Sequence, residues 1–191
     1  MARLRFGAFL APHHPIGEHP MLQFRRDIAL VEQLDKLGYD EFWCGEHHSS
    51  GWEMIASPEM FLAAAAERTS RIKLATGVVS LPYHHPFHVA QRMVQLDWMS
   101  GGRAIFGSGP GALASDAHSL GVDPMLLRDR QDEAIQVIRS FDEGWEHKNL
   151  KRVDSVLAPN YVYFTQSGGL FSRDSLVQTA GSPVYTLSRV H

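Results

Sequence analysis

One pattern occurs four times along the first 140 residues of this 191-residue chain. A short apolar run is followed by a loop rich in polar residues, and then by a segment whose apolar residues recur every three or four positions. Short apolar runs indicate buried strands, and the three-to-four spacing indicates helices. Strands that alternate with helices at this spacing form βαβ units around a parallel sheet, so the chain is expected to have an α/β fold.

The polar loops follow the strands, and this order favours one architecture. Expected strands cover residues 4–11, 39–44, 71–81 and 103–108, and expected helices cover 21–37, 57–69, 85–99 and 124–141. Gly38 is typical of a helix C-cap, and Ser57-Pro58 is typical of a helix start. A (β/α)8 barrel carries its site at the carboxyl ends of its strands. We therefore predict a partial (β/α)8 TIM barrel of about four βα units.

The pattern changes near residue 141. An amphipathic helix is expected over residues 145–157, and strand-like stretches cover 161–165 and 184–190. Helices and strands in this order are typical of an α+β segment. We predict a half barrel over residues 1–141 and a short α+β segment over residues 142–191.

Charge and cysteine content exclude several classes of partner. The net charge of −3 includes no basic stripe, so we expect no nucleic acid. Cys44 is the only cysteine, which excludes an intrachain disulfide and favours a reducing, cytoplasmic location. No apolar run reaches the roughly 20 residues that cross a bilayer, so no membrane segment is expected.

Three adjacent histidine pairs follow three different expected strands: His13-His14, His47-His48 and His84-His85. Imidazoles at one rim of a barrel could bind zinc or iron, as in a metal-dependent hydrolase. Adjacent residues of an extended chain point to opposite sides, so one pair rarely shares a ligand. We therefore predict no metal. The alternative to a chemical role is that these histidines only hydrogen-bond their loops.

Two loops carry the best candidates for chemistry. Glu46, His47 and His48 place a carboxylate beside two imidazoles, a set that exchanges protons near neutral pH. The alternative is a salt-bridged loop end. Gly107, Ser108 and Gly109 lie in a glycine-rich loop through which backbone can approach a planar or anionic ligand. The alternative for these residues is a tight turn.

The chain also resembles a known family, the bacterial luciferase-like flavin monooxygenases, and in particular its limonene and alkane monooxygenase branch. The resemblance covers residues 4 to about 141. It rests on Phe6-Gly-Ala-Phe-Leu-Ala-Pro, Leu37-Gly-Tyr-Asp-Glu, Gly45-Glu-His-His, Ser57-Pro-Glu, Ala64-Ala-Ala-Glu-Arg-Thr, Thr76-Gly-Val-Val-Ser-Leu-Pro-Tyr-His-His-Pro, Gly102-Arg and Gly107-Ser-Gly-Pro-Gly-Ala-Leu.

The resemblance implies an enzyme that receives reduced FMN from a separate flavin reductase and uses oxygen to oxygenate a small apolar organic substrate. It implies that His47 is the acid/base, with Glu46 and His48 as its neighbours. It also implies a non-prolyl cis peptide at Gly77-Val78 beneath the flavin, and contacts from Gly107, Ser108 and Gly109 to the flavin.

Departures from the family pattern limit these expectations. Gly109 and Pro110 stand where some relatives have a cysteine and an arginine, and the later strands of a complete barrel are absent. We therefore expect this chain to be truncated and inactive by itself, and to form a homo-oligomer. A rival interpretation is a non-catalytic remnant that acts as a self-associating module. Residues from about 140 onward resemble the start of an NTF2-like, SnoaL-type domain.

Overall fold

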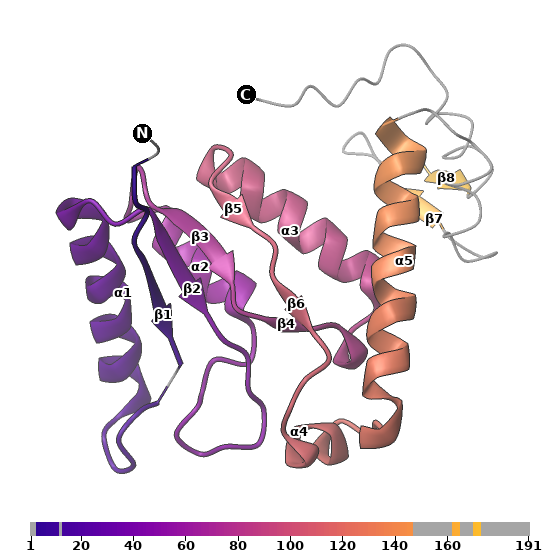
Figure 1. Cartoon of the computed structure of the whole chain (residues 1–191), viewed down its shortest axis with the longest axis horizontal. Helices are drawn as coiled ribbons and strands as arrows, with labels where there is room; N and C mark the ends of the chain where they lie inside the picture. Colours follow the sequence, from indigo (N-terminus) through magenta and orange to yellow (C-terminus); the bar gives the residue numbers. More distant parts are fainter. Residues whose placement is uncertain (1–2, 12, 147–161, 165–169, 173–191) are drawn as a thin grey trace. The chain divides into compact units, whose positions relative to one another are not determined.

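A computed structural model of the chain describes residues 3–11, 13–146, 162–164 and 170–172 (Figure 1). The chain divides into two compact units, Met1–Asp132 and Glu133–His191. The first unit contains the parallel strands and the loops that follow them. The candidate site residues all lie in this unit.

Four short parallel strands form the main sheet. They are β1 (Gly7–Leu10), β2 (Glu41–Cys44), β3 (Lys73–Thr76) and β5 (Ala104–Ile105), in the order β1-β2-β3-β5. Their register aligns Phe9 with Trp43, Trp43 with Ala75, and Ala75 with Ile105. The α/β class and the parallel sheet are thus confirmed.

Two expected strands are each divided in the structure. Residues 71–81 contain β3 and then β4 (Val79–Ser80), and residues 103–108 contain β5 and then β6, which runs over Ser108–Gly109. Strands β4 and β6 pair with each other in a separate parallel sheet. The cis peptide Gly77-Val78 lies in the interval between β3 and β4, at the position that the family resemblance implies.

The helices follow the strands as expected. They are α1 (Pro20–Leu37), α2 (Pro58–Ala66), α3 (Pro86–Ser100), α4 (Ala114–Ser119) and α5 (Leu127–Glu146), with 3-10 turns η1 (Leu81–Tyr83) and η2 (Pro124–Leu126). Gly38 ends α1 in the left-handed region at φ 90°, which an L side chain rarely adopts. The sequence did not predict α4, and α5 extends five residues past the expected end at residue 141.

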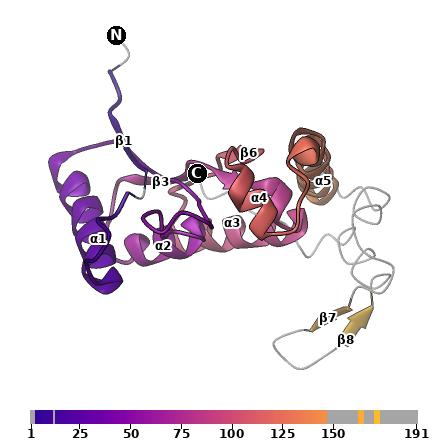
Figure 2. The same ribbon diagram turned by 90° about the horizontal axis from the view of Figure 1, so that it is seen from below.

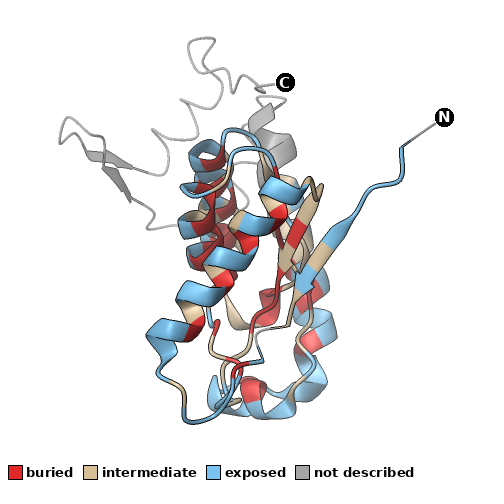
Figure 3. Cartoon of the chain, turned by 90° about the vertical axis from the view of Figure 1, so that its left-hand side faces the viewer, coloured by how far each residue is buried: buried red, intermediate tan, exposed pale blue. Residues whose placement is uncertain are grey.

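The core of the first unit lies between the sheet and the helices. Helices α1, α2 and α3 lie on one side of the strands (Figure 2). Phe42, Cys44, Leu74 and Thr76 are fully buried on that side, and Figure 3 shows the buried residues gathered between helices and strands. Side chains alternate between the two faces of a strand, and Phe9 lies on the face of the sheet away from the helices, where it is 62% exposed.

Arg103 joins the helix layer to the sheet. Its guanidinium donates hydrogen bonds to the carbonyl oxygens of Ala66, Thr69, Ile72 and Ser100 and to the Thr69 hydroxyl, over distances of 2.7–3.2 Å. Two of these carbonyls lie at or just beyond the end of α2, where backbone acceptors have no helical partner. The side chain therefore fixes the entry into β3 and explains the Gly102-Arg motif.

In the second unit the structure describes the end of α5 and a hairpin. Strands β7 (Val162–Phe164) and β8 (Leu170–Ser172) pair antiparallel. β7 confirms the strand expected over residues 161–165. The helix expected over 145–157 begins within the last two residues of α5 and otherwise lies outside the described residues, as does the strand expected over 184–190. The expected division at residue 141 falls inside α5 and stays a prediction, as does the NTF2-like assignment.

Candidate active site

Glu46 is the centre of a hydrogen-bonded group at the carboxyl ends of the strands. Its side chain is fully buried. Oε1 accepts hydrogen bonds from His48 Nε2 at 2.6 Å and from His84 Nε2 at 2.7 Å, and Oε2 accepts one from the Ser80 backbone N–H at 2.8 Å. We call Glu46, His48 and His84 the Glu46 cluster. It joins the loop after β2 to the segment that follows β4.

The pKa shifts inside the Glu46 cluster favour a negative Glu46 carboxylate and a positive His48 imidazole. Burial alone would raise the pKa of Glu46, but the hydrogen bonds from His48, His84 and the Ser80 N–H together lower it. The hydrogen bond to Glu46 raises the pKa of His48 despite partial burial. A carboxylate beside an imidazolium is therefore the favoured state of this pair at mildly acidic pH.

The Glu46 cluster also has donor types that a metal could use. One ligand atom from each residue lies within 4.8 Å of the others. The separations of 2.6 and 2.7 Å between Glu46 Oε1 and the two imidazole nitrogens are those of charge-assisted hydrogen bonds with a proton between the atoms. We therefore interpret the cluster as a proton-sharing network, and the expectation of no metal stays a prediction.

His47 points away from Glu46 and toward a different carboxylate. Its Nδ1 lies 3.1 Å from Asp116 Oδ2, and the other oxygen of Asp116 accepts hydrogen bonds from the backbone N–H groups of His48 and Ser49 and from the Ser49 hydroxyl. Burial opposes ionisation of Asp116, but the bonds from Ser49, His47 and His48 lower its pKa. Asp116 therefore holds the imidazole of His47 while the side chain of His47 stays 27% exposed.

Asp116 was not among the site residues predicted from the sequence. This residue lies on α4, which is only six residues long and gives no periodic signal. Its position in the polar segment after the fourth strand was the available signal, because such segments meet at one rim of a barrel.

The first histidine pair is divided between two environments. His14 is buried, and its Nε2 lies 2.6 Å from Asp27 Oδ2 on α1. His13 is exposed, and its Nε2 lies 3.3 Å from Glu53 Oε1. These contacts connect the loop after β1 to α1 and to the loop after β2. This agrees with the interpretation that this histidine pair stabilises its loop.

The glycines after the fourth strand are required by close packing within the chain. A Cβ on Gly107 would lie 2.2 Å from the Thr76 carbonyl oxygen, and one on Gly109 would lie 2.8 Å from Val78 Cγ2. The Thr76 hydroxyl also donates to the Gly107 carbonyl at 2.8 Å. These contacts account for glycine at 107 and 109 without a ligand. A role for Gly107, Ser108 and Gly109 toward a cofactor stays a prediction.

The sheet face opposite the helices fits a flat aromatic group. A Cβ on Gly77 would lie 3.2 Å from the Phe9 ring and 3.3 Å from the Trp43 ring, so both rings border the cis peptide. Such an apolar face suits a planar ring system. The Tyr83 ring packs edge-on against His48, with ring centroids 5.8 Å apart. Its hydroxyl is buried close to Gly111 and has no hydrogen-bond partner in the described part of the chain.

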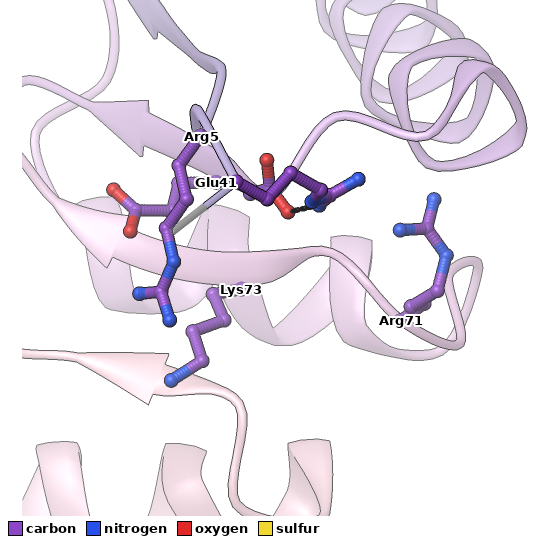
Figure 4. Close-up of a pocket in the computed structure, with 6 residues that line it drawn as sticks. Arg5, Glu41, Arg71 and Lys73 are labelled. Atoms are coloured by element: carbon purple, nitrogen blue, oxygen red, sulfur yellow. Dashed lines mark hydrogen bonds and ion pairs between the residues drawn. The ribbon is translucent and has the colours of Figure 1, made fainter. Parts of the chain in front are cut away.

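A hollow of about 470 Å³ lies at the other ends of the strands (Figure 4). Its lining is largely charged: Arg3, Arg5, Asp40, Glu41, Arg71 and Lys73. Arg3 pairs with Asp40. None of the candidate site residues lines this hollow. No histidine lines this hollow, and it lies at the opposite ends of the strands from His47, so we do not assign it as the candidate active site.

Known proteins are similar to this chain. A family described as luciferase-like monooxygenase matches residues 4–160. The chain is 60% identical over 142 residues to limonene 1,2-monooxygenase of Rhodococcus erythropolis. It is 58% identical over 146 residues to 4-hydroxyprotoasukamycin monooxygenase of Streptomyces nodosus subsp. asukaensis. These matches cover 74% and 76% of the chain but only 37% and 39% of the relatives, so the chain spans about two fifths of their length.

A solved structure has the same fold. It is the oxygenating constituent of 3,6-diketocamphane monooxygenase from Pseudomonas putida, in complex with FMN. The TM-score is 0.69 at 25% identity, and the match covers 88% of this chain and 43% of that one. None of the helices in the described part of the chain combines the length and the apolar character that crossing a bilayer requires.

Proposed function

Because the chain belongs to the luciferase-like monooxygenase family, we propose that it forms the acid/base and flavin-facing part of an FMN-dependent monooxygenase. The observation that carries this proposal is the position of His47. Its imidazole is held by Asp116 at the carboxyl ends of the strands, and its side chain remains partly exposed. An imidazole that a carboxylate holds in place and that is partly exposed has the position that a general acid or base requires.

The flavin would lie against the sheet face that Phe9, Trp43 and the cis peptide Gly77-Val78 form. When bound, reduced FMN supplies the electrons that activate oxygen. The apolar rings of Phe9 and Trp43 would keep water from one side of the flavin. The loop from Gly107 to Gly109 would border its edge. The FMN complex of the diketocamphane oxygenase supports this choice of cofactor.

His47 is the proposed acid/base, and its neighbours are proposed to hold it in place. Asp116 accepts from Nδ1, which leaves Nε2 as the nitrogen that exchanges a proton during turnover. Glu46 fixes the loop on which His47 lies, because it accepts hydrogen bonds from His48, His84 and the Ser80 N–H. The charge of Glu46 also favours the cationic form of His48.

The substrate is proposed to be a small apolar organic molecule, and limonene is the first compound to test because it is named for a relative that is 60% identical. A separate flavin reductase is proposed as a partner, since the structural relative is described as an oxygenating constituent. A reducing, cytoplasmic location is proposed, in keeping with the buried free thiol of Cys44, whose pKa burial raises.

A homo-oligomer is proposed because exposed apolar side chains lie next to β1, an edge strand of the described sheet. Leu4 is 72% exposed and Phe6 is 57% exposed. Apolar surface of this kind favours association with a second copy. The expectation that the chain alone is inactive stays a prediction.

A titration with FMN, followed by a product assay, tests the proposed function. The full 191-residue chain is titrated with reduced and oxidised FMN, and then incubated with a flavin reductase, limonene and oxygen. Flavin binding together with limonene oxide formation supports the proposal. Absence of flavin binding at millimolar FMN would overturn it for this chain. Binding with release of hydrogen peroxide alone would support the cofactor and contradict the substrate.

A further inference from the structure

Glu53 lies between two imidazoles that belong to different loops. Its Oε1 is 3.3 Å from His13 Nε2, and its Oε2 is 3.6 Å from His47 Nε2. We propose that His13 and Glu53 form a proton path that connects His47 to solvent. This proposal rests on the proposed role of His47 as the acid/base.

The backbone fixes the position of Glu53. Glu53 pairs with His13 in an isolated antiparallel bridge, and the Trp52 carbonyl accepts a hydrogen bond of 2.7 Å from the His14 N–H. The Glu53 N–H donates to the Ser50 carbonyl at 3.1 Å. The loops after β1 and β2 are thus tied together beside the carboxylate. This arrangement brings a residue of the first loop next to the acid/base on the second.

His13, at the outer end of the path, is the most exposed of the three side chains. The side chain of His13 is 67% exposed, that of Glu53 is 10% exposed, and that of His47 is 27% exposed. A buried carboxylate needs a compensating partner. In the part of the chain that the structure describes, the two imidazoles are the only side-chain partners shown for the Glu53 carboxylate.

The two nitrogens of His47 have different surroundings. Nδ1 faces Asp116, whose pKa is lowered by its hydrogen bonds, so Asp116 stays ionised and acts as a fixed acceptor. Nε2 faces Glu53, whose carboxylate lies between this nitrogen and His13 Nε2. Asp116 is thus the positioning group for His47, and Glu53 is the exchanging group.

One proton moves from His13 to His47 through Glu53 in two steps. The N–H bond at His13 Nε2 breaks and an O–H bond forms on Glu53. The carboxyl group then turns, its O–H bond breaks, and an N–H bond forms at His47 Nε2. No group is oxidised or reduced. Each step needs the atoms to approach by about 0.5 to 0.8 Å to reach hydrogen-bond distance, a common adjustment between resting and working states of a site.

The exchange rate of the His47 ring N–H with water distinguishes this path from a purely structural ion pair. The full chain is labelled with ¹⁵N-histidine and studied by NMR at low temperature and about pH 5.5, where imidazole N–H groups are populated. No flavin, reductase or substrate is present. The result therefore does not depend on whether the chain is a monooxygenase.

Three variants are compared with the wild type. Glu53→Gln keeps the shape of the side chain but cannot carry the proton, and His13→Gln removes the exposed end of the path. His88→Gln, at an exposed histidine on α3, is the matched control. Backbone amide spectra show whether each variant keeps the wild-type fold.

Slower exchange supports the proposal, and the slowing should be about tenfold or more in Glu53→Gln, with a smaller effect in His13→Gln and none in His88→Gln. Unchanged or faster exchange in a folded Glu53→Gln would overturn the proposal. Faster exchange would indicate that the contact is purely structural and that its loss opens the loop to water. If Glu53→Gln does not fold, His13→Gln decides alone, and wild-type exchange in that variant would also overturn the proposal.

Discussion

Replacing Glu46 by glutamine removes the charge at the centre of the Glu46 cluster and keeps the size of the side chain. The fully buried carboxylate accepts three hydrogen bonds in the wild type, two of them from imidazoles. Removing one partner of a buried ion pair costs about 3–5 kcal/mol. The glutamine oxygen can still accept one hydrogen bond, so we expect a loss of about 2–4 kcal/mol in the free energy of unfolding near pH 6.

The pH dependence of this loss follows from the two pKa shifts. The pKa of Glu46 is lowered, so its contribution is present above the ordinary value of 4.5 and is lost as the pH falls through the lowered pKa. The pKa of His48 is raised, so its contribution is present below the ordinary value of 6.5 and is lost as the pH rises through the raised pKa. The difference between wild type and Glu46→Gln should therefore be largest between about pH 5 and 6.5, and smaller at about pH 8.5.

Urea unfolding of both proteins at about pH 6 and pH 8.5 measures this difference. Glu67→Gln is the matched control, because Glu67 is exposed at the end of α2. We expect the control to change stability by less than about 0.5 kcal/mol. A Glu46→Gln loss that is below 1 kcal/mol, or equal at both pH values, would refute the assignment of a charged pair.

Three further results are expected. Arg103→Met should lower the free energy of unfolding by about 2–4 kcal/mol, because several buried carbonyls lose their hydrogen-bond donor. Thermal unfolding should show a lower Tm, and an unchanged Tm would contradict this expectation. Asp116→Ala should release the ring of His47, seen as a change in its imidazole ¹⁵N shifts with the fold retained, whereas wild-type shifts would exclude the contact. Phe6→Ser should weaken self-association measured by light scattering, and a monomeric wild type would disprove the oligomer.

The alternation of strands and helices was predictable because both periodicities are local. The expected strand over 39–44 contains β2, and Gly38 caps α1 as predicted. The division of residues 71–81 into β3 and β4 could not be predicted from composition, because the run is apolar throughout and pairing partners decide where a strand ends. The family resemblance nevertheless predicted the cis peptide at Gly77-Val78, which lies at this division.

The candidate site was predicted in its members but not in its connections. Adjacent histidines diverge, as predicted, at His47 and His48, which face Asp116 and Glu46. The convergence of His48 and His84, from different loops, on one carboxylate was not predicted. Ends of parallel strands meet at one edge of a sheet, but which side chains meet there depends on loop conformation, which sequence spacing does not determine.

The rate of oxygenation by His47→Ala tests the central claim most directly. Under conditions in which the wild type forms product, the variant is compared with the wild type and with His118→Ala, at an exposed histidine on α4, in the presence of a flavin reductase, reduced FMN and substrate. Losing an acid/base should slow product formation by about 10² to 10⁴ while FMN affinity changes little, and His118→Ala should match the wild type. Wild-type turnover in His47→Ala would contradict the role assigned to this imidazole.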